Sequence, residues 1–435
     1  MNFNKQLIIL LSIINTILKS SLFRTAGFYG GFTIINAIIP FLLLPILTRA
    51  MTPADFGLVA IFSVLMTFFS PFIGLSTHAA IARQYYNKED VDFRIYLTNC
   101  FFILLSSTLF FSIFIFLFAD QISVLSEFPK SWIGYVIITS FCTTIVSIAL
   151  TLWQVQSKSF YYGIFQVSNT IVNVIFSLWF VIFLGLTWKG RILAQVVTSI
   201  IFAIFSLFIL RRNKWFKFIF NKKYILNALK FSIPLIPHTL GAIVMSMTDR
   251  IFIAKFVGLE AAGLFSVGFT FASIIGFMEN SFNLAYAPWL FSKLKTADFS
   301  YKKRLVKFTY FYFIIILLLS ILFSLSSPYF LKYYLGKEFQ GAREFVFWLC
   351  LSFSFSGMYK MVVNYIFYAE KTKLLAWITF TSAAINIPAN YFLINHYGAV
   401  GSAMATAFVS IFFFFFTWIL SNRVYKMPWL FQKQF

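Results

Sequence analysis

Apolar runs of about twenty residues recur along the chain and are separated by short polar corners. Runs of this length match the hydrocarbon thickness that a helix crosses in a membrane. Twelve can be bracketed, at 28–47, 57–80, 97–118, 132–152, 162–184, 192–210, 233–256, 263–284, 308–325, 345–366, 374–393 and 400–420. The pattern predicts an all-α integral membrane protein with about 12 transmembrane helices.

One corner of the pattern returns later in the chain. The stretch ILTRAMTPADFGLVAIFS aligns without a gap with FIAKFVGLEAAGLFSVGF, matching Arg49 to Lys255 and Gly57 to Gly263 at an offset of 206 residues. A second pair, TWKGRILAQVVTS and YGAVGSAMATAFVS, matches at an offset of 211 residues. Two matches at nearly one offset predict two homologous six-helix lobes.

These two patterns divide the chain into five parts. An N-terminal segment too short to span a membrane is predicted to be an interfacial amphipathic helix rather than a cleaved signal peptide. The N-lobe carries six spans, a basic cytoplasmic linker follows, and the C-lobe carries six more before a cytoplasmic tail. The expected boundaries are 1–20, 21–212, 213–230, 231–421 and 422–435.

Composition supports lipid as the solvent of this chain. Hydrophobic residues make up 60% of it and charged residues 11%, which is too much apolar surface for a soluble core. The net charge of +22 would suggest nucleic acid in a soluble protein, but 25 of the 35 lysines and arginines fall on the side of the termini. The positive-inside rule therefore makes both termini cytoplasmic, and no nucleic-acid partner is expected.

Enzymatic signals are missing from the sequence. No loop is long enough for a soluble catalytic domain, and nucleotide-binding and metalloprotease signatures are absent. Three cysteines lie inside apolar runs without metal-ligand spacing, and we interpret them as core residues (Cys100, Cys142, Cys350). We expect a transporter rather than an enzyme, with no metal and no cofactor.

Each lobe begins with a helix interrupted by glycine and proline. The residues concerned are Gly27, Gly30, Gly31, Pro40 and Pro45 in the first lobe and Pro234, Pro237 and Gly241 in the second. Paired interruptions at matching places are typical of the moving helices of transporters. The alternative interpretation is that both residue types are simply common in membrane helices.

Charged residues inside the predicted spans are costly, and each requires a partner or water. Asp249 and Arg250 lie side by side in the first span of the second lobe. Arg250 could bind an anionic substrate while Asp249 holds a coupling ion. The alternative is a mutually neutralising pair.

Two more charges lie within apolar runs. Glu279 is deep in its span, where an unpaired carboxylate would take up a proton, so it is a candidate for ion coupling. A structural pairing with a basic residue on a facing helix is the alternative. Lys360 either lines a cavity or extends its chain to the cytoplasmic interface.

Arg24 and Arg83 lie at the cytoplasmic ends of the first two spans, which a short corner makes neighbours. Guanidinium groups bind phosphate oxygens bidentately, so the two could receive a diphosphate together. Ordinary positive-inside anchoring explains them as well.

The corner LPILTRAMTPADFG and the run IPLIPHTLGAIVMSMTDRIFIAKFVGLEAAGLFSVGF resemble the polysaccharide and O-antigen flippases of the multidrug/oligosaccharidyl-lipid/polysaccharide superfamily. The similarity extends from about Ser21 to Leu420 and includes YGAVGSAMATA. The resemblance implies two six-helix lobes around a central cationic cavity that opens alternately to each side of a bacterial inner membrane.

The resemblance also implies a substrate and a set of site residues. The substrate would be an undecaprenyl-diphosphate-linked oligosaccharide, moved from the cytoplasmic to the periplasmic leaflet with H+ or Na+ as the coupling ion. Arg24, Arg83 and Arg250 would be its basic contacts, and Arg49 and Lys255 would be periplasmic gate or interface residues. Membrane lipids, a polysaccharide polymerase and a chain-length regulator are the implied partners.

Two other functions remain open at this point. A multidrug or toxin exporter of the same superfamily would have an apolar or acidic pocket for cationic drugs. A membrane polysaccharide polymerase or ligase would usually have a large periplasmic loop, and none is visible.

The residues and the resemblance agree on one point. A diphosphate cannot cross hydrocarbon unaided, and the expected cavity cations would offset the cost of removing it from water.

Overall fold

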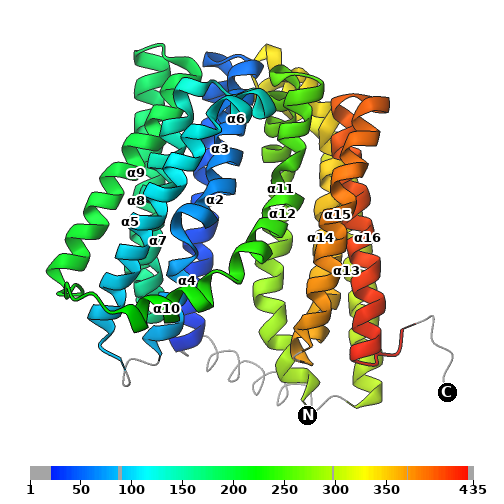
Figure 1. Cartoon of the computed structure of the whole chain (residues 1–435). Coiled ribbons are helices and arrows are strands. Elements are labelled where there is room, and N and C mark those ends of the chain that lie inside the picture. Colours follow the sequence, from blue (N-terminus) through cyan, green and yellow to red (C-terminus); the bar gives the residue numbers. More distant parts are fainter. Residues whose placement is uncertain (1–20, 87–90, 296–297, 370, 430–435) are drawn as a thin grey trace.

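The computed structural model describes residues 21–86, 91–295, 298–369 and 371–429. These residues are almost entirely helical (Figure 1), and no strand occurs among them. The predicted interfacial segment, 1–20, and the end of the predicted tail lie outside the described residues. Nine of the described helices are long and apolar enough to cross a membrane.

The N-lobe supplies six long helices, one for each predicted span. They are α2 (Ser21–Ala50), α3 (Pro53–Gly74), α5 (Phe93–Leu117), α7 (Ile133–Val155), α8 (Ser159–Leu178) and α9 (Thr187–Arg212). Short elements join them: α4 (Thr77–Tyr85), α6 (Ala119–Ser126), the 3-10 turn η1 (Lys130–Trp132) and the π-helical turn η2 (Trp179–Phe183).

The C-lobe repeats this plan, and four of its six long helices, α12 to α15, are longer than their counterparts in the N-lobe. Its spanning helices are α11 (Leu235–Phe256), α12 (Leu259–Leu294), α13 (Phe299–Tyr334), α14 (Arg343–Tyr368), α15 (Thr372–Tyr397) and α16 (Ala399–Val424). A 3-10 turn, η3 (Lys337–Ala342), precedes α14. Helix α10 (Lys222–Ser232) occupies the second half of the expected linker. The all-α, twelve-helix, two-lobe prediction is confirmed.

The predicted span 57–80 is wrong at its second end. Helix α3 stops at Gly74, and Leu75 and Ser76 both adopt the left-handed conformation, with φ of 43° and 50°. The Thr77 hydroxyl then donates to the Gly74 carbonyl at 2.9 Å, and α4 begins. Every residue from 72 to 81 is apolar or small except for one histidine and a few hydroxyls, so hydropathy does not mark this break.

The polar corner between the first two spans forms as its sequence suggests. Thr52 caps α3: its hydroxyl oxygen accepts from the Asp55 amide at 3.2 Å, and the Asp55 carboxylate accepts from the Thr52 amide at 3.0 Å. Pro53 occupies the first helical turn, where no backbone donor is needed. The helix thus starts one turn before the predicted 57.

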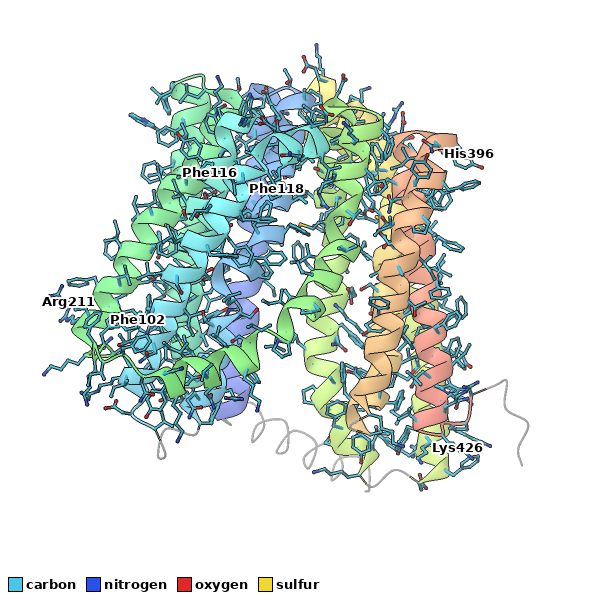
Figure 2. All side chains as sticks on the ribbon, viewed as in Figure 1. Phe102, Phe116, Phe118, Arg211, His396 and Lys426 are labelled. Carbon is cyan, nitrogen blue, oxygen red and sulfur yellow. The ribbon has the colours of Figure 1, made fainter. Side chains whose placement is uncertain are left out.

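The two ends of the bundle differ, and we call them the α6 end and the linker end. At the α6 end the two lobes lie side by side, whereas at the linker end α10 crosses between them (Figure 1). Figure 2 shows Arg211 and Lys426 at the linker end and His396 at the α6 end. The linker and the C-terminal tail therefore leave the bundle at the same end, as an even number of spans between them requires.

Candidate functional site

The repeat-matched corners meet at the α6 end, where α3 packs on α12. A Cβ atom added to Gly57 would collide with the Leu259 carbonyl, and one added to Gly263 would collide with the Pro53 carbonyl. Each glycine thus allows the backbone of its own corner to touch the backbone of the other corner. The pair related by the sequence repeat is also a pair in space.

The two cations expected at the gate or interface each contact the opposite lobe. Arg49, at the end of α2, donates to the Pro45 carbonyl at 2.7 Å and to the Tyr333 carbonyl of α13 at 3.0 Å. Lys255, at the end of α11, donates to the Val124 carbonyl at 2.8 Å and pairs with Glu127 at 3.0 Å. Both bonds reach across the lobe boundary at the α6 end.

Two further contacts complete this closed end. The Thr48 hydroxyl accepts from the Gly336 amide at 3.1 Å, and a Cβ on Gly336 would collide with the Thr48 carbonyl. The Phe56 ring meets the Phe339 ring edge to face at 5.1 Å. Backbone contact, ring packing and charged hydrogen bonds therefore all join the lobes at the same end of the bundle.

Asp249 belongs to a polar cluster inside the C-lobe. Its side chain is 1% exposed; Asn390 donates to one carboxylate oxygen at 2.9 Å, and Thr406 donates to the other at 2.8 Å. Asn390 also donates to Asn386 and accepts from Ser402. The cluster thus links α11 to α15 and α16 with a set of oxygen atoms around one carboxylate.

Arg250 extends toward a different helix. It is 8% exposed, and its guanidinium carbon lies 4.5 Å from the centre of the Phe269 ring and 5.5 Å from that of Phe265, both on α12. Aromatic faces attract a cation in a desolvated setting. Neighbours in sequence, Asp249 and Arg250 therefore contact different helices.

Glu279 and Lys360 are brought together across α12 and α14. Glu279 is 3% exposed; one of its oxygens accepts from Lys360 at 3.0 Å and from Ser356 at 3.2 Å. Its other oxygen is buried without a hydrogen-bond partner among the described residues. Lys360 also donates to Asn280 at 3.1 Å, and its side chain is 24% exposed. A basic partner on a facing helix was one of the two alternatives for Glu279.

The structure places Arg83 with the linker. Its guanidinium donates to Asn227 of α10 at 2.6 Å and stacks over the Phe231 ring at 4.3 Å. Arg83 thus lies at the linker end, whereas Arg250 lies in the last two turns of α11, toward the α6 end. The Arg24 side chain lies outside the described residues, so the expected pairing of Arg24 with Arg83 stays a prediction.

Sequence reasoning missed the neutral partners of these charges. Asn386 and Asn390 are four residues apart, as are Ser402 and Thr406, so each pair occupies one helix face. That spacing was the available signal, but neutral polar residues recur in many membrane helices and only their contact with Asp249 distinguishes these. In the described part of the chain, no three histidine, cysteine, aspartate or glutamate side chains are grouped so that they could hold a metal ion.

Comparison with solved structures places this fold among transporters. A structure of the lipid II flippase MurJ in an inward closed conformation shares 15% identity, covers 92% of this chain and 87% of its own, and has a TM-score of 0.69. An inward-facing multidrug resistance MATE transporter of the MOP superfamily shares 14% identity over 94% and 96%, with a TM-score of 0.63. At these identities the likeness is one of fold.

Curated relatives and a family model add sequence evidence. The chain is 28% identical to an uncharacterized membrane protein of Haemophilus influenzae over 81% of this chain and 85% of that protein. It is 24% identical to Lsg locus putative protein 1 of the same organism, over 81% and 86%. The model of the family described as "Polysaccharide biosynthesis protein" matches residues 22–295, more than half of the chain. This multi-pass membrane protein therefore belongs to the polysaccharide biosynthesis protein family and shares its fold with the MurJ and MATE structures.

Proposed function

We propose that the protein is a flippase that moves undecaprenyl-diphosphate-linked oligosaccharide units from the cytoplasmic to the periplasmic leaflet of a bacterial inner membrane. The observation that carries this proposal is the pair of cations, Arg250 and Lys360, held in spanning helices of a two-lobed bundle whose lobes join at the α6 end. The buried Arg250 and the partly exposed Lys360 would offset the desolvation of a diphosphate, while the polyisoprenyl tail stays in lipid.

The side on which the bundle is closed follows from a proposed orientation. If the linker end is cytoplasmic, the α6 end is periplasmic, and the glycine contacts of Gly57 and Gly263 close the bundle on that side. Alternating access then consists of separating these contacts while the cytoplasmic ends approach each other. Reporter fusions after Arg212 and after Lys426 test the orientation; two periplasmic signals would contradict it.

We propose that Asp249 couples transport to an ion gradient. The Asp249 carboxylate of α11 and the Thr406 hydroxyl of α16 bring oxygens together there, beside the Asn390 side chain of α15, and oxygen ligands are the ones that hard cations prefer. A bound ion would hold α11, α15 and α16 together, and release of the ion would free α11 to move. Transport that depends on Asp249 and follows a Na+ or an H+ gradient supports this assignment; transport unaffected by Asp249→Asn would contradict it.

A drug exporter is less well supported by the same contacts. Such a protein would have carboxylates available to cationic drugs, yet Asp249 is 1% exposed, which is too enclosed for a drug-sized cation, and Glu279 pairs with Lys360. The MATE likeness concerns the fold alone. We therefore assign the anionic lipid substrate.

Deletion of the gene in its native host tests the proposal. We expect lipid-linked repeat units to accumulate on the cytoplasmic leaflet, with less surface glycan and unchanged sugar-transferase activity in membrane extracts. A deletion strain that displays single repeat units on its surface would contradict transport, because translocation would have occurred without the protein. A polymerase and a chain-length regulator are the partners we propose downstream.

A further inference from the structure

The segment between the lobes carries an unusual combination of exposed aromatic and basic side chains. Residues 211–230 contain seven lysines and arginines and no acidic residue. Phe218 is 77% exposed and Phe220 is 71% exposed, and Ile219 between them is also exposed. We define the basic linker surface as nine exposed residues of this segment, namely Arg211, Arg212, Lys214, Lys217, Phe218, Ile219, Phe220, Lys222 and Lys223.

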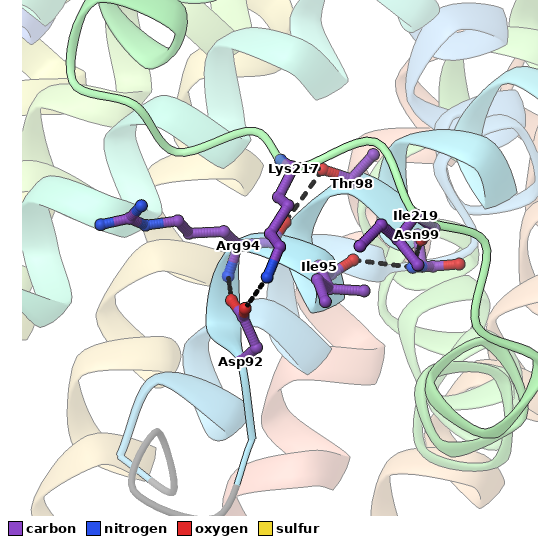
Figure 3. A network of polar contacts seen from close by, with 7 residues as sticks. All are labelled: Asp92, Arg94, Ile95, Thr98, Asn99, Lys217 and Ile219. Atoms are coloured by element: carbon purple, nitrogen blue, oxygen red, sulfur yellow. Dashed lines mark hydrogen bonds and ion pairs between the residues drawn. The ribbon is translucent and has the colours of Figure 1, made fainter.

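The backbone of this surface is fastened to the start of α5. The Lys217 amide donates to the Thr98 hydroxyl at 3.0 Å, and Asn99 donates to the Ile219 carbonyl at 2.8 Å (Figure 3). The Asn221 amide donates to Asn99 at 2.9 Å. Backbone groups outside regular structure need partners of this kind. The exposed aromatic side chains are therefore presented by a fixed backbone.

Ring packing on the inner side of the segment also fixes its position against α5. Phe216 meets Phe101 edge to face at 5.1 Å, and Trp215 meets Phe93 at 5.6 Å. The centres of the Phe220 and Phe102 rings lie 6.4 Å apart, and Figure 2 shows Phe102 and Arg211 toward the linker end of the N-lobe. The exposed phenylalanines thus continue the outer flank of α5, which faces lipid in a membrane protein.

Among the described residues, the acidic side chain that contacts this segment is already paired. Asp92 accepts from Lys217 at 2.9 Å (Figure 3), and this hydrogen bond lowers the pKa of the Asp92 carboxyl below its ordinary value. Asp92 therefore stays charged at neutral pH and offsets one cation. The ion pairs among the described residues involve Lys130, Lys217, Lys255 and Lys360, and Lys214, Lys222 and Lys223 are exposed.

We propose that the basic linker surface binds the headgroups of anionic phospholipids in the leaflet at the linker end. The lysines of this surface attract the phosphates of the lipid headgroups, while Phe218 and Phe220 insert between acyl chains beside the flank of α5. A protein partner would not explain why the aromatic side chains continue a lipid-facing helix. Because α10 also contacts α4, α5 and α11, bound lipid would act on the segment that joins the two lobes.

Native mass spectrometry of the purified full-length protein in detergent tests this proposal. Phosphatidylglycerol and phosphatidylcholine are titrated separately, and bound lipids are counted. Lys214→Gln, Lys222→Gln and Lys223→Gln are combined in one variant; Phe218→Ser and Phe220→Ser are combined in another. We expect phosphatidylglycerol to bind more tightly than phosphatidylcholine, and the triple variant to lose roughly fivefold in affinity per removed cation.

A matched control removes three exposed lysines elsewhere at the linker end. The control combines Lys293→Gln on α12 with Lys303→Gln and Lys307→Gln on α13, away from the basic linker surface. The control should keep the phosphatidylglycerol affinity of the wild type, and the double serine variant should weaken binding of that lipid. Equal losses in the control and the linker triple, or equal binding of the two lipids by the wild type, would overturn the proposal.

Discussion

The contacts of the charged residues inside the spans come mostly from other helices and not from their neighbours in sequence. Asp249 is held by Asn390 and Thr406, and Arg250 stacks on Phe265 and Phe269. A pair that only neutralised itself would not need two separate sets of partners. The arrangement favours distinct roles, with Asp249 at a coupling site and Arg250 at a substrate contact.

Removal of the Arg250 charge tests its role directly. If Arg250 contacts the diphosphate, Arg250→Gln should lower apparent substrate affinity roughly ten- to a hundredfold, the range for a hydrogen bond to a charged group. Arg250→Lys should keep part of the function, because charge remains but the bidentate fork is lost. Surface glycan is measured in a deletion strain at matched membrane abundance.

The double variant separates substrate contact from self-neutralisation. Asp249→Asn combined with Arg250→Gln leaves no unpaired charge, so it should restore function if Arg250 only balances Asp249. We expect no restoration. Full surface glycan from Arg250→Gln, or from the double variant, would contradict the substrate-contact role.

The Glu279 and Lys360 pair gives a stability prediction. Lys360→Met leaves a carboxylate that is 3% exposed without its cation, and breaking a buried pair in this way costs about 3–5 kcal/mol. Glu279→Gln should cost less, because the partly exposed Lys360 can turn toward water. Denaturant unfolding of the detergent-solubilised variants, followed by circular dichroism, checks this order.

Replacing both partners of that pair is the control for it. The variant with Glu279→Gln and Lys360→Met should recover most of the loss caused by Lys360→Met alone, since no buried charge stays unpaired. An additive loss in the double variant would show that the two side chains do not depend on each other.

Sequence alone located the charged members of these clusters but not their partners. Asp249, Glu279 and Lys360 stand out because a charge in an apolar run is costly anywhere. Asn390 and Thr406 do not stand out, because neutral polar residues in membrane helices find partners within their own helix as well. Which of them turns toward a carboxylate depends on the packing of α15 and α16 on α11, and this is not encoded locally.

At the scale of elements, the corner between α2 and α3 carries a signal that hydropathy alone does not use. The Thr52, Pro53 and Asp55 spacing specifies a helix start, and the helix begins there, one turn before the predicted 57. The break at Leu75 and Ser76 was not predictable, because it lies within an apolar stretch. Its left-handed residues are held by the hydrogen bond of Thr77 to Gly74 and by close packing of Gly74 on Thr144.

The glycine contact between the corners predicts a conformational effect. Gly57→Ala adds a methyl group where the Leu259 carbonyl lies, and neither backbone can yield without separating α3 from α12. We expect the closed α6 end to open, which lengthens the distance between spin labels introduced at Asp120 and Glu338 when measured by double electron–electron resonance. The native cysteines are buried and should escape labelling.

A second glycine in the same lobe serves as the control for that variant. A Cβ on Gly134 would meet Phe116 at 3.7 Å, an ordinary contact, so Gly134→Ala should leave the label distance unchanged. An unchanged distance in Gly57→Ala as well would show that the glycine contact does not hold the α6 end closed.

At the scale of the whole molecule, the internal repeat has a spatial meaning. Gly57 and Gly263 match in the sequence and touch in the structure, while Arg49 and Lys255 match and each bind the opposite lobe. Two lobes built from one design meet where their equivalent corners pack together. The sequence predicted the lobes from periodicity and repeat, but the end at which they join depends on long-range packing.

Transport by purified protein tests the central claim most directly. Full-length protein is reconstituted in vesicles that carry a fluorescent polyisoprenyl-diphosphate oligosaccharide, and the fraction of lipid accessible to an external quencher is followed over time. The account predicts faster exchange between leaflets than in protein-free vesicles, and a rate reduced by Arg250→Gln. Exchange no faster than in protein-free vesicles, under either a Na+ or an H+ gradient, would contradict the account.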